Sequence, residues 1–318
     1  MATTTDYLNQ LKKDLTTAKT NLANLGVEVL ESDTFTEVSA KMADIKASGS
    51  GEVEVQANGN SSNYAWMHAV TELPKIIVRN VSTKGLNHFF KFYSGEILNI
   101  DFTKMDQSAS SIANMFESCA SLKEIHGLEG LDTKDVTTMT NLFQNCRNLL
   151  SVDLSNFDTG NVTSMSNMFS ECKMLTSLNL SNFNTSKVTN MTSMFYLCSS
   201  LSSLDISSFD MSKVTSVSGM FALPIKNTSL TDLKFGYNYG AGFSTTQSSN
   251  YSYYRLDVSK YEGLTETSII SILNGLYDIK SKGCNPQQCI LGETNLAKLT
   301  SEGQQALAQA QAYGWTVS

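Results

Sequence analysis

A pattern of apolar and polar positions recurs about every 26 residues through the middle of the chain. Each unit contains an apolar residue followed by phenylalanine, and these phenylalanines are Phe116, Phe143, Phe169, Phe195 and Phe221. The steps between them are 27, 26, 26 and 26 residues. Repetition at a fixed period of this length predicts a solenoid, in which each unit buries its apolar side against its neighbours.

Each unit is expected to hold two elements. The pattern Leu-x-x-Leu-x-Leu, seen with variations at 149–154, 175–180, 201–206 and 230–235, predicts a short strand in each unit. Side chains two residues apart share one face of a sheet. A second apolar stripe predicts a helical or 3₁₀ segment that returns the chain to the next strand. In one unit this stripe consists of Val188, Met191, Met194 and Phe195. The expected fold class is therefore an α/β repeat with a parallel sheet.

The repeat closely resembles the unit of the BspA-like leucine-rich-repeat family, N-M-F-x-x-C-x-x-L-x-x-L-x-L-S-x-F-x-T-x-x-V-T-x-M. The matching positions in one unit are Asn167, Met168, Phe169, Cys172, Leu175, Leu178, Leu180, Phe183, Thr185, Val188, Thr189 and Met191. The resemblance covers about 110–236, and 73–78 and 97–102 fit degenerate coils that precede it. It implies a leucine-rich-repeat solenoid that serves surface adhesion or recognition rather than catalysis.

The first fifty residues follow a different pattern. Apolar residues at alternating steps of three and four form a heptad seam typical of a coiled coil. They are Leu8, Leu11, Leu15, Ala18, Leu22 and Leu25, followed by Val29. A second helix is expected from Thr34 to Ile45, and Ala47-Ser-Gly-Ser-Gly51 is typical of a flexible linker. The head either associates with other copies, most simply as a trimer, or folds back as an intramolecular hairpin.

This short coiled-coil-like head, with its second helix and Gly/Ser hinge, resembles the openings of phage tail and virion proteins from Gram-positive hosts. The run at 294–300 and the Gly-Trp-Thr that follows at 314–316 also resemble the ends of phage-encoded repeat proteins. The segment 255–318, which contains these last two features, is predicted to have the order strand, helix, strand, helix, strand. The strands are expected at 256–258, 290–291 and 315–317, and the second helix is expected to end at Gly314.

Composition and charge narrow the functional classes. The formal net charge is −7 and no run of Lys or Arg occurs, so nucleic acid is not expected as a partner. No stretch is apolar enough to span a membrane, and neither a signal peptide nor an anchor is expected. No motif indicates a catalytic site, a metal or a cofactor. Asp153, Asp205 and Asp210 occupy equivalent or near-equivalent places in the repeat, where roles in turns are sufficient.

The six cysteines fall into two groups. Cys119, Cys146, Cys172 and Cys198 recur in register, and we expect buried free thiols, because a linear ladder does not converge on one metal ion. Cys284 and Cys289 lie outside the repeat. They form either a local disulfide across a short loop or a pair of free thiols.

An aromatic segment at 237–254 interrupts the repeat. It is rich in Tyr, Ser, Gly and Asn, which is the composition that antibody combining sites use. It either binds a partner or glycan or packs on neighbouring coils. The candidate ligand-binding residues are Tyr237, Tyr239, Phe243, Tyr251, Tyr253 and Tyr254.

These observations predict a non-enzymatic phage virion protein, a tail fibre or receptor-binding protein, located on the virion and made in the host cytoplasm. The expected partners are a host cell-surface glycan or protein, other virion proteins through the head, and further copies of the chain. The alternatives are a bacterial cell-surface adhesin, a capsid decoration protein and, as a third class, a glycan-degrading enzyme. The expected domains are a helical head (1–46), a linker (47–51), an N-terminal cap with degenerate repeats (52–109), the main repeats (110–236), the aromatic insertion (237–254) and a C-terminal cap (255–318).

Overall fold

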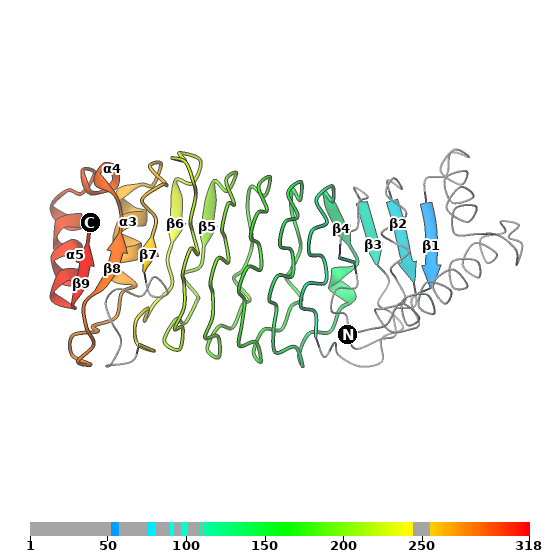
Figure 1. The fold of residues 1–318 in the computed structure, drawn as a ribbon, viewed down its shortest axis with the longest axis horizontal. Coiled ribbons are helices and arrows are strands. Elements are labelled where there is room, and N and C mark those ends of the chain that lie inside the picture. The colour runs from blue at the N-terminus through cyan, green and yellow to red at the C-terminus, as the bar shows by residue number, and fades with distance from the viewer. Residues whose placement is uncertain are drawn as a thin grey trace, which may run out of the picture.

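The computed structural model describes residues 90–91, 109, 111–243 and 255–318, together with the backbone of three strands nearer the N-terminus. These residues form small parallel sheets with few helices, a mixed α/β arrangement. Successive coils of the chain lie side by side along one axis, with the first strands at one end and the C-terminus at the other (Figure 1). Parallel sheets and helices agree with the α/β class expected from the sequence.

The first sheet has four parallel strands in chain order. They are β1 (Glu52–Gln56), β2 (Lys75–Arg79), β3 (Ile97–Ile100) and β4 (Glu124–His126). β2 and β3 lie where degenerate coils are expected. A 3₁₀ turn, η2 (Leu128–Gly130), follows β4.

A second parallel pair, β5 (Ser203–Asp205) and β6 (Asp232–Lys234), lies further along the stack. The strands expected at 149–154 and 175–180 are absent. These two coils approach their predecessors through backbone hydrogen bonds from Leu150 to Lys123 and from Met174 to Arg147, at 3.1 and 3.2 Å, without forming a ladder. The predicted apolar alternation holds nonetheless, since Leu154 and Leu180 are buried in the core.

The segment opposite the strands is a ladder of turns, and not the helical or 3₁₀ segment expected from its apolar stripe. Asn167 and Glu171 have φ values of 54° and 62°, and left-handed residues of this kind interrupt a right-handed helix every fourth position. The N–H groups of Asn167, Phe169 and Glu171 each donate to the next coil, at 2.7 to 3.0 Å. We call the equivalent segments 112–119, 139–146, 165–172 and 191–198 the turn wall.

The core between the strands and the turn wall is built from columns of identical residues. The rings of Phe90, Phe116, Phe143, Phe169, Phe195 and Phe221 stack with centroids 5.2 to 5.9 Å apart. Each cysteine of the ladder lies beside this column and donates its thiol to the phenylalanine carbonyl of an earlier coil. One such bond joins Cys172 Sγ to the oxygen of Phe143 at 3.2 Å. The repeated sequence thus places like side chains on like, which is why its period is so regular.

A column of threonines also forms hydrogen bonds with backbone groups of the next coil. Thr159 is buried, and its hydroxyl accepts a hydrogen bond from the N–H of Asn184 at 2.7 Å and donates to its carbonyl at 3.0 Å. Thr133 makes the same pair of bonds with Asp158. Buried backbone groups need such partners, so these threonines join neighbouring coils where no strand does.

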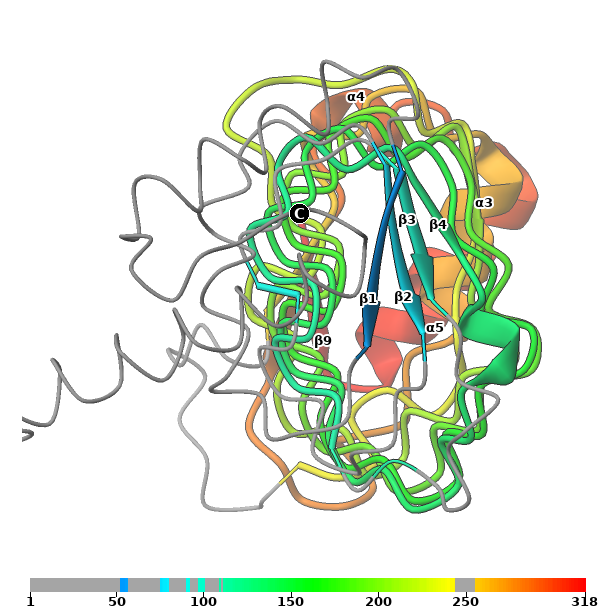
Figure 2. The ribbon, with the colours of Figure 1, turned by 90° about the vertical axis from the view of Figure 1, so that its right-hand side faces the viewer.

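The C-terminal elements follow the order that the sequence predicts. They are β7 (Leu256–Asp257), α3 (Glu266–Asn274), β8 (Gln287–Ile290), α5 (Ser301–Ala312) and β9 (Trp315–Val317), with one unexpected short helix, α4 (Glu293–Leu296). The strands form a third parallel sheet, β7-β8-β9. Viewed along the stack, α3 lies on the side of β4, whereas β9 lies toward the other side (Figure 2). The expected C′ residue, Gly314, has a φ of 95°.

Candidate binding surface

One side of the stack, formed by β4, β5, β6 and the coils between them, presents exposed polar side chains. We call this side the strand wall. Along it runs one side chain from each of four coils, Asp153, Asn179, Asp205 and Lys234, which we call the polar row. Asp205 lies opposite Lys234 in the β5–β6 register, and the other two precede Asp205 by one and two repeats. All four side chains are exposed, while the adjacent Leu204 and Leu233 point into the core.

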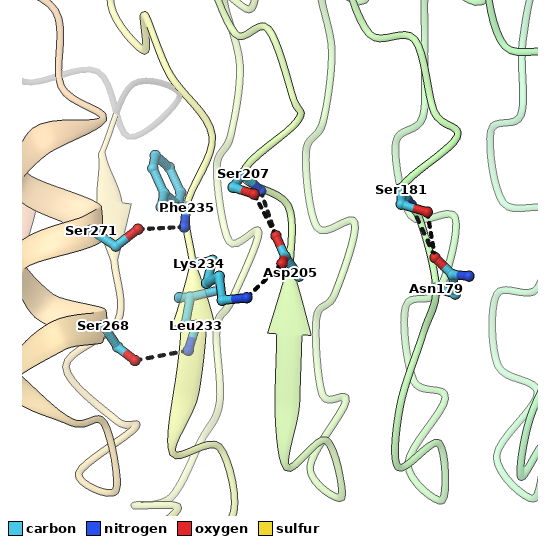
Figure 3. Close-up of polar contacts among 9 residues, drawn as sticks. All are labelled: Asn179, Ser181, Asp205, Ser207, Leu233, Lys234, Phe235, Ser268 and Ser271. Atoms are coloured by element: carbon cyan, nitrogen blue, oxygen red, sulfur yellow. Dashed lines mark hydrogen bonds and ion pairs between the residues drawn. The ribbon is translucent and has the colours of Figure 1, made fainter.

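Three side chains of the polar row, those of Asp153, Asn179 and Asp205, are held by their own backbone turns. Asn179 Oδ1 accepts hydrogen bonds from the N–H and the hydroxyl of Ser181, at 3.2 and 2.8 Å. Asp205 Oδ1 does the same with Ser207, at 3.0 and 2.6 Å (Figure 3). In Figure 3 the amide nitrogen of Asn179 points away from Ser181. Oδ1 of both residues is therefore held by the following serine, whereas the second head-group atom of Asn179 points away from its turn.

The row ends in an ion pair. Lys234 Nζ lies 2.9 Å from Asp205 Oδ2, and both side chains are more than half exposed. The hydrogen bonds from Ser207, followed by the bond from Lys234, lower the pKa of Asp205 to about 2. The backbone N–H of Ser155 likewise lowers the pKa of Asp153. Both shifts favour the charged form of the carboxyl group.

Helix α3 closes the strand wall at its C-terminal end. The hydroxyl of Ser268 accepts from the N–H of Leu233, and that of Ser271 accepts from the N–H of Phe235, both at 2.9 Å (Figure 3). These two hydroxyls occupy the backbone donors that a further strand would need. A ligand on this wall would therefore contact side chains and would not pair with the backbone of β6.

The structure separates the predicted aromatic residues. Tyr237 is 47% exposed, whereas Tyr239 and Phe243 are 0% and 2% exposed and pack against Trp315 of β9. Tyr239 and Phe243 therefore correspond to the alternative of packing on neighbouring coils and have no surface for a ligand. Binding by Tyr237 stays a prediction. The other three candidates lie outside the described residues, and they are Tyr251, Tyr253 and Tyr254.

The two cysteines outside the repeat are free thiols in the structure, as are the four in the ladder. The disulfide considered for Cys284 and Cys289 is therefore absent. Cys289 points into the core from β8, while Cys284 lies in the preceding loop and directs its sulfur to the carbonyl of Phe243 at 3.7 Å. The two side chains thus face different surroundings.

We expect one thiol of six to react in the native protein. Burial raises the pKa of Cys198 and of Cys289 to about 12 and holds that of Cys172 well above its usual value, so these thiols stay protonated and inert. Only Cys284 is partly exposed. Alkylation at neutral pH, followed by mass measurement, should give one rapid addition, and all six after unfolding. Cys284→Ser should abolish the rapid addition. Two rapid additions in the native protein would contradict the burial of the other five thiols.

Among the described residues, no group of three or more His, Cys, Asp or Glu could hold a metal ion. Asp153, Asp205 and Asp210 each accept a hydrogen bond from the backbone two residues later, which agrees with their expected use in turns. Within the described part of the chain, no helix combines the length and apolarity needed to cross a membrane. The predicted oligomerisation residues, Leu8 to Leu25, lie outside the described residues.

The polar row was only partly visible in the sequence. Its signal is an Asp or Asn between the last two apolar residues of the Leu-x-x-Leu-x-Leu pattern, with Ser two positions later, as in Leu154 preceded by Asp153 and followed by Ser155. That pattern predicts a turn. It does not reveal that the head groups align, which depends on how neighbouring coils stack.

Fold and surface together define a mixed α/β protein of stacked parallel coils with an exposed polar wall. Residues 110–232 match a family model described as a Mycoplasma protein of unknown function, DUF285, a domain that is associated with BspA-like repeat proteins. The match spans the coils that carry most of the polar row and ends before the C-terminal helices. No curated protein and no solved structure matches the chain.

Proposed function

We propose that the chain is a non-enzymatic recognition protein whose BspA-like leucine-rich-repeat solenoid displays the strand wall to a cell surface. The polar row is the observation that carries this proposal. The head groups of Asn179 and Asp205 are exposed and fixed by their own turns, so little of their conformational freedom is lost when a ligand binds. The match of 110–232 supports the same class, since the matching domain is associated with BspA-like proteins.

In its finer form, the proposal is a phage virion protein, a tail fibre or receptor-binding protein that attaches to the host. The support is the resemblance of the head and linker to virion proteins. The head would join the particle and the solenoid would face the host, with several copies gaining avidity from individually weak sites. A capsid decoration protein needs the same two parts.

The alternative is a bacterial cell-surface adhesin. The specific observation in its favour is the matching family, whose description names Mycoplasma. An adhesin and a virion protein would use the same strand wall and differ in what holds the other end of the chain.

Binding to intact cells tests the shared proposal. The labelled full-length chain should bind saturably to some members of a panel of Gram-positive and wall-less bacterial cells. Asn179→Ala should weaken this binding, whereas Asn148→Ala, which removes an exposed asparagine outside the row, should not. Failure to bind any member of the panel, or release of oligosaccharide from the cells, would reject the proposal.

Native mass tests the role of the head. If the heptad seam assembles the protein, the full-length chain should have the mass of a trimer, and Leu15→Asp with Leu22→Asp should give a monomer, because charges at core positions of a coiled coil oppose association. Leu150→Asp, a change at an exposed leucine of the repeats, serves as the control. A monomeric full-length chain would favour the hairpin and count against a trimeric fibre.

A further inference from the structure

The polar row suggests which class of ligand the strand wall takes. We propose that it binds a linear, uncharged polysaccharide that lies along the stack, with about one sugar unit for each coil. This inference rests on the proposed recognition function and narrows its ligand.

The first support is the spacing of the coils. The stacked phenylalanine rings of successive coils have centroids 5.2 to 5.9 Å apart in the core. The paired strands that carry Asp205 and Lys234 lie about 4.8 Å apart. Both spacings are close to the length of one sugar ring in an extended chain. Asp153, Asn179, Asp205 and Lys234 repeat with the same coils. A polymer with an equivalent hydroxyl on every unit can therefore meet an equivalent side chain on every coil, which a ligand without a repeat cannot do.

The second support is the hydrogen-bonding character of the row. The amide nitrogen of Asn179 and the ammonium of Lys234 are donors, and the carboxylates of Asp153 and Asp205 are acceptors. Because Oδ1 of Asp153, Asn179 and Asp205 is held by a following serine, their second head-group atoms are already oriented. Oδ2 of Asp205 also bonds to Lys234, and this exposed pair offers a joint donor and acceptor to a ligand. Sugar hydroxyls both donate and accept, so they match a row that mixes the two roles.

The third support comes from the ligands that this wall does not suit. The row holds two carboxylates and one ammonium, so an anionic polymer such as nucleic acid is disfavoured. The edge of β6 is closed by Ser268 and Ser271, so an added peptide strand finds no backbone donors. The exposed large apolar side chains of the described residues, Leu150, Met174, Ile225 and Tyr237, lie outside the row, so an apolar helix has no stripe to cover.

Affinity as a function of ligand length tests the proposal. The probes are neutral linear oligosaccharides, β-linked glucose and N-acetylglucosamine oligomers from two units upward, titrated into the full-length protein. Each added unit should raise affinity about two- to tenfold, the value of one net hydrogen bond, until about four units span the row. High salt should leave the affinity nearly unchanged, because the ligand carries no charge.

Two variants locate the site. Asn179→Ala should lower the affinity for the longer oligomers about two- to tenfold or more, while Asn148→Ala should leave it unchanged. Asp205→Asn keeps the acceptor for Ser207, as Asn179 does for Ser181, and removes the charge together with the ion pair to Lys234. It should change binding of a neutral sugar chain less than Asn179→Ala does, whereas a cationic ligand would lose affinity steeply. Thermal unfolding of each variant confirms that the coil is intact.

The outcomes separate this inference from the proposed function. Binding to cells without binding to any neutral oligosaccharide would overturn the glycan assignment and leave the recognition function standing. Affinity that does not grow with length, or that is equal in wild type and Asn179→Ala, would also overturn it. Absence of binding to both cells and oligosaccharides would reject the inference and the proposed function together.

Discussion

Replacing Phe169 by alanine is expected to destabilise the stack by about 3–5 kcal/mol, the cost of truncating a buried phenylalanine. The side chain is fully buried, and its ring stacks on Phe143 at 5.7 Å and on Phe195 at 5.9 Å. Alanine removes the ring and leaves a cavity between two flat neighbours. Those neighbours are held by their own coils, so they cannot collapse to fill it. Thermal and denaturant unfolding measure the loss.

A matched variant separates volume from ring contacts. Phe169→Leu keeps much of the buried volume but loses both ring stacks, whose contribution beyond burial is about 0.5–1.5 kcal/mol for each pair. We therefore expect a loss intermediate between wild type and Phe169→Ala. If alanine and leucine were equally stable, the column would be less tightly packed than the stacking implies.

The effect should also be local. The coils of 143–146, 169–172 and 195–198 are joined by hydrogen bonds of the turn wall, so weakening the middle one loosens both junctions. Amide exchange should accelerate most at Phe143 and Phe169, whose N–H groups bond to the next coil. Acceleration spread evenly to α3 and α5 would show that the stack unfolds as a single unit instead.

The buried set was the most predictable part of this fold. Met168, Phe169 and Cys172 recur at a fixed period. A period of this length predicts that successive units stack, with equivalent side chains packed against one another in the core. The C-terminal order of strands and helices was predictable for a similar reason, since the change from period two to period 3.6 is local information. Gly314, predicted to end the second helix, follows α5 and has the positive φ expected of a glycine at that position.

The backbone of the turn wall was not predictable in this way. Its apolar stripe has helical spacing, yet the N–H groups of Asn167 and Glu171 bond to the next coil rather than within a helix. Asparagine tolerates a positive φ, which is a weak local hint, but Glu171 and Leu197 adopt it as well. The partner coil decides the conformation, and a single unit of sequence contains no information on that partner's position.

Some features of the candidate surface could be predicted from the sequence and others could not. The turn roles of Asp153 and Asp205 follow from sequence, because an acid two residues before a serine typically caps a turn. The burial of Tyr239 and Phe243 does not follow. Their composition is that of a binding loop, and only the position of Trp315, more than seventy residues later, removes them from solvent.

Gly275→Ala is the second change with a large expected effect. We expect it to destabilise the protein, although alanine would normally stabilise a site with this backbone conformation. Gly275 follows α3 with φ −75° and ψ −13°, a conformation that alanine adopts freely. At such a site, alanine normally stabilises a protein by about 0.4–1 kcal/mol, because it restricts the unfolded chain. Here a Cβ atom would lie 2.2 Å from the carbonyl oxygen of Gly236 and 2.7 Å from the ring of Phe235.

The clash with Gly236 involves backbone on both sides, so no side-chain rotation relieves it. The N–H of Tyr239 also donates to the carbonyl of Gly275 at 3.0 Å, which ties the two coils together at this point. Relief requires the C-terminal unit to move away from β6 and the bonds from Ser268 and Ser271 to stretch. We expect a loss of about 3 kcal/mol or more, at the upper end of the cost of overpacking.

Gly160→Ala provides the control, since its added Cβ would meet only side-chain atoms, Asp158 Oδ1 at 3.2 Å and Asn184 Nδ2 at 3.7 Å. Both can shift at the exposed surface, so the unfolding temperature should stay close to that of wild type. A large difference between the two variants assigns the loss at Gly275 to the junction between the repeats and the C-terminal cap. Equal stability would mean that the cap can separate from β6 without cost, and the strand wall would then lack the fixed end that α3 gives it.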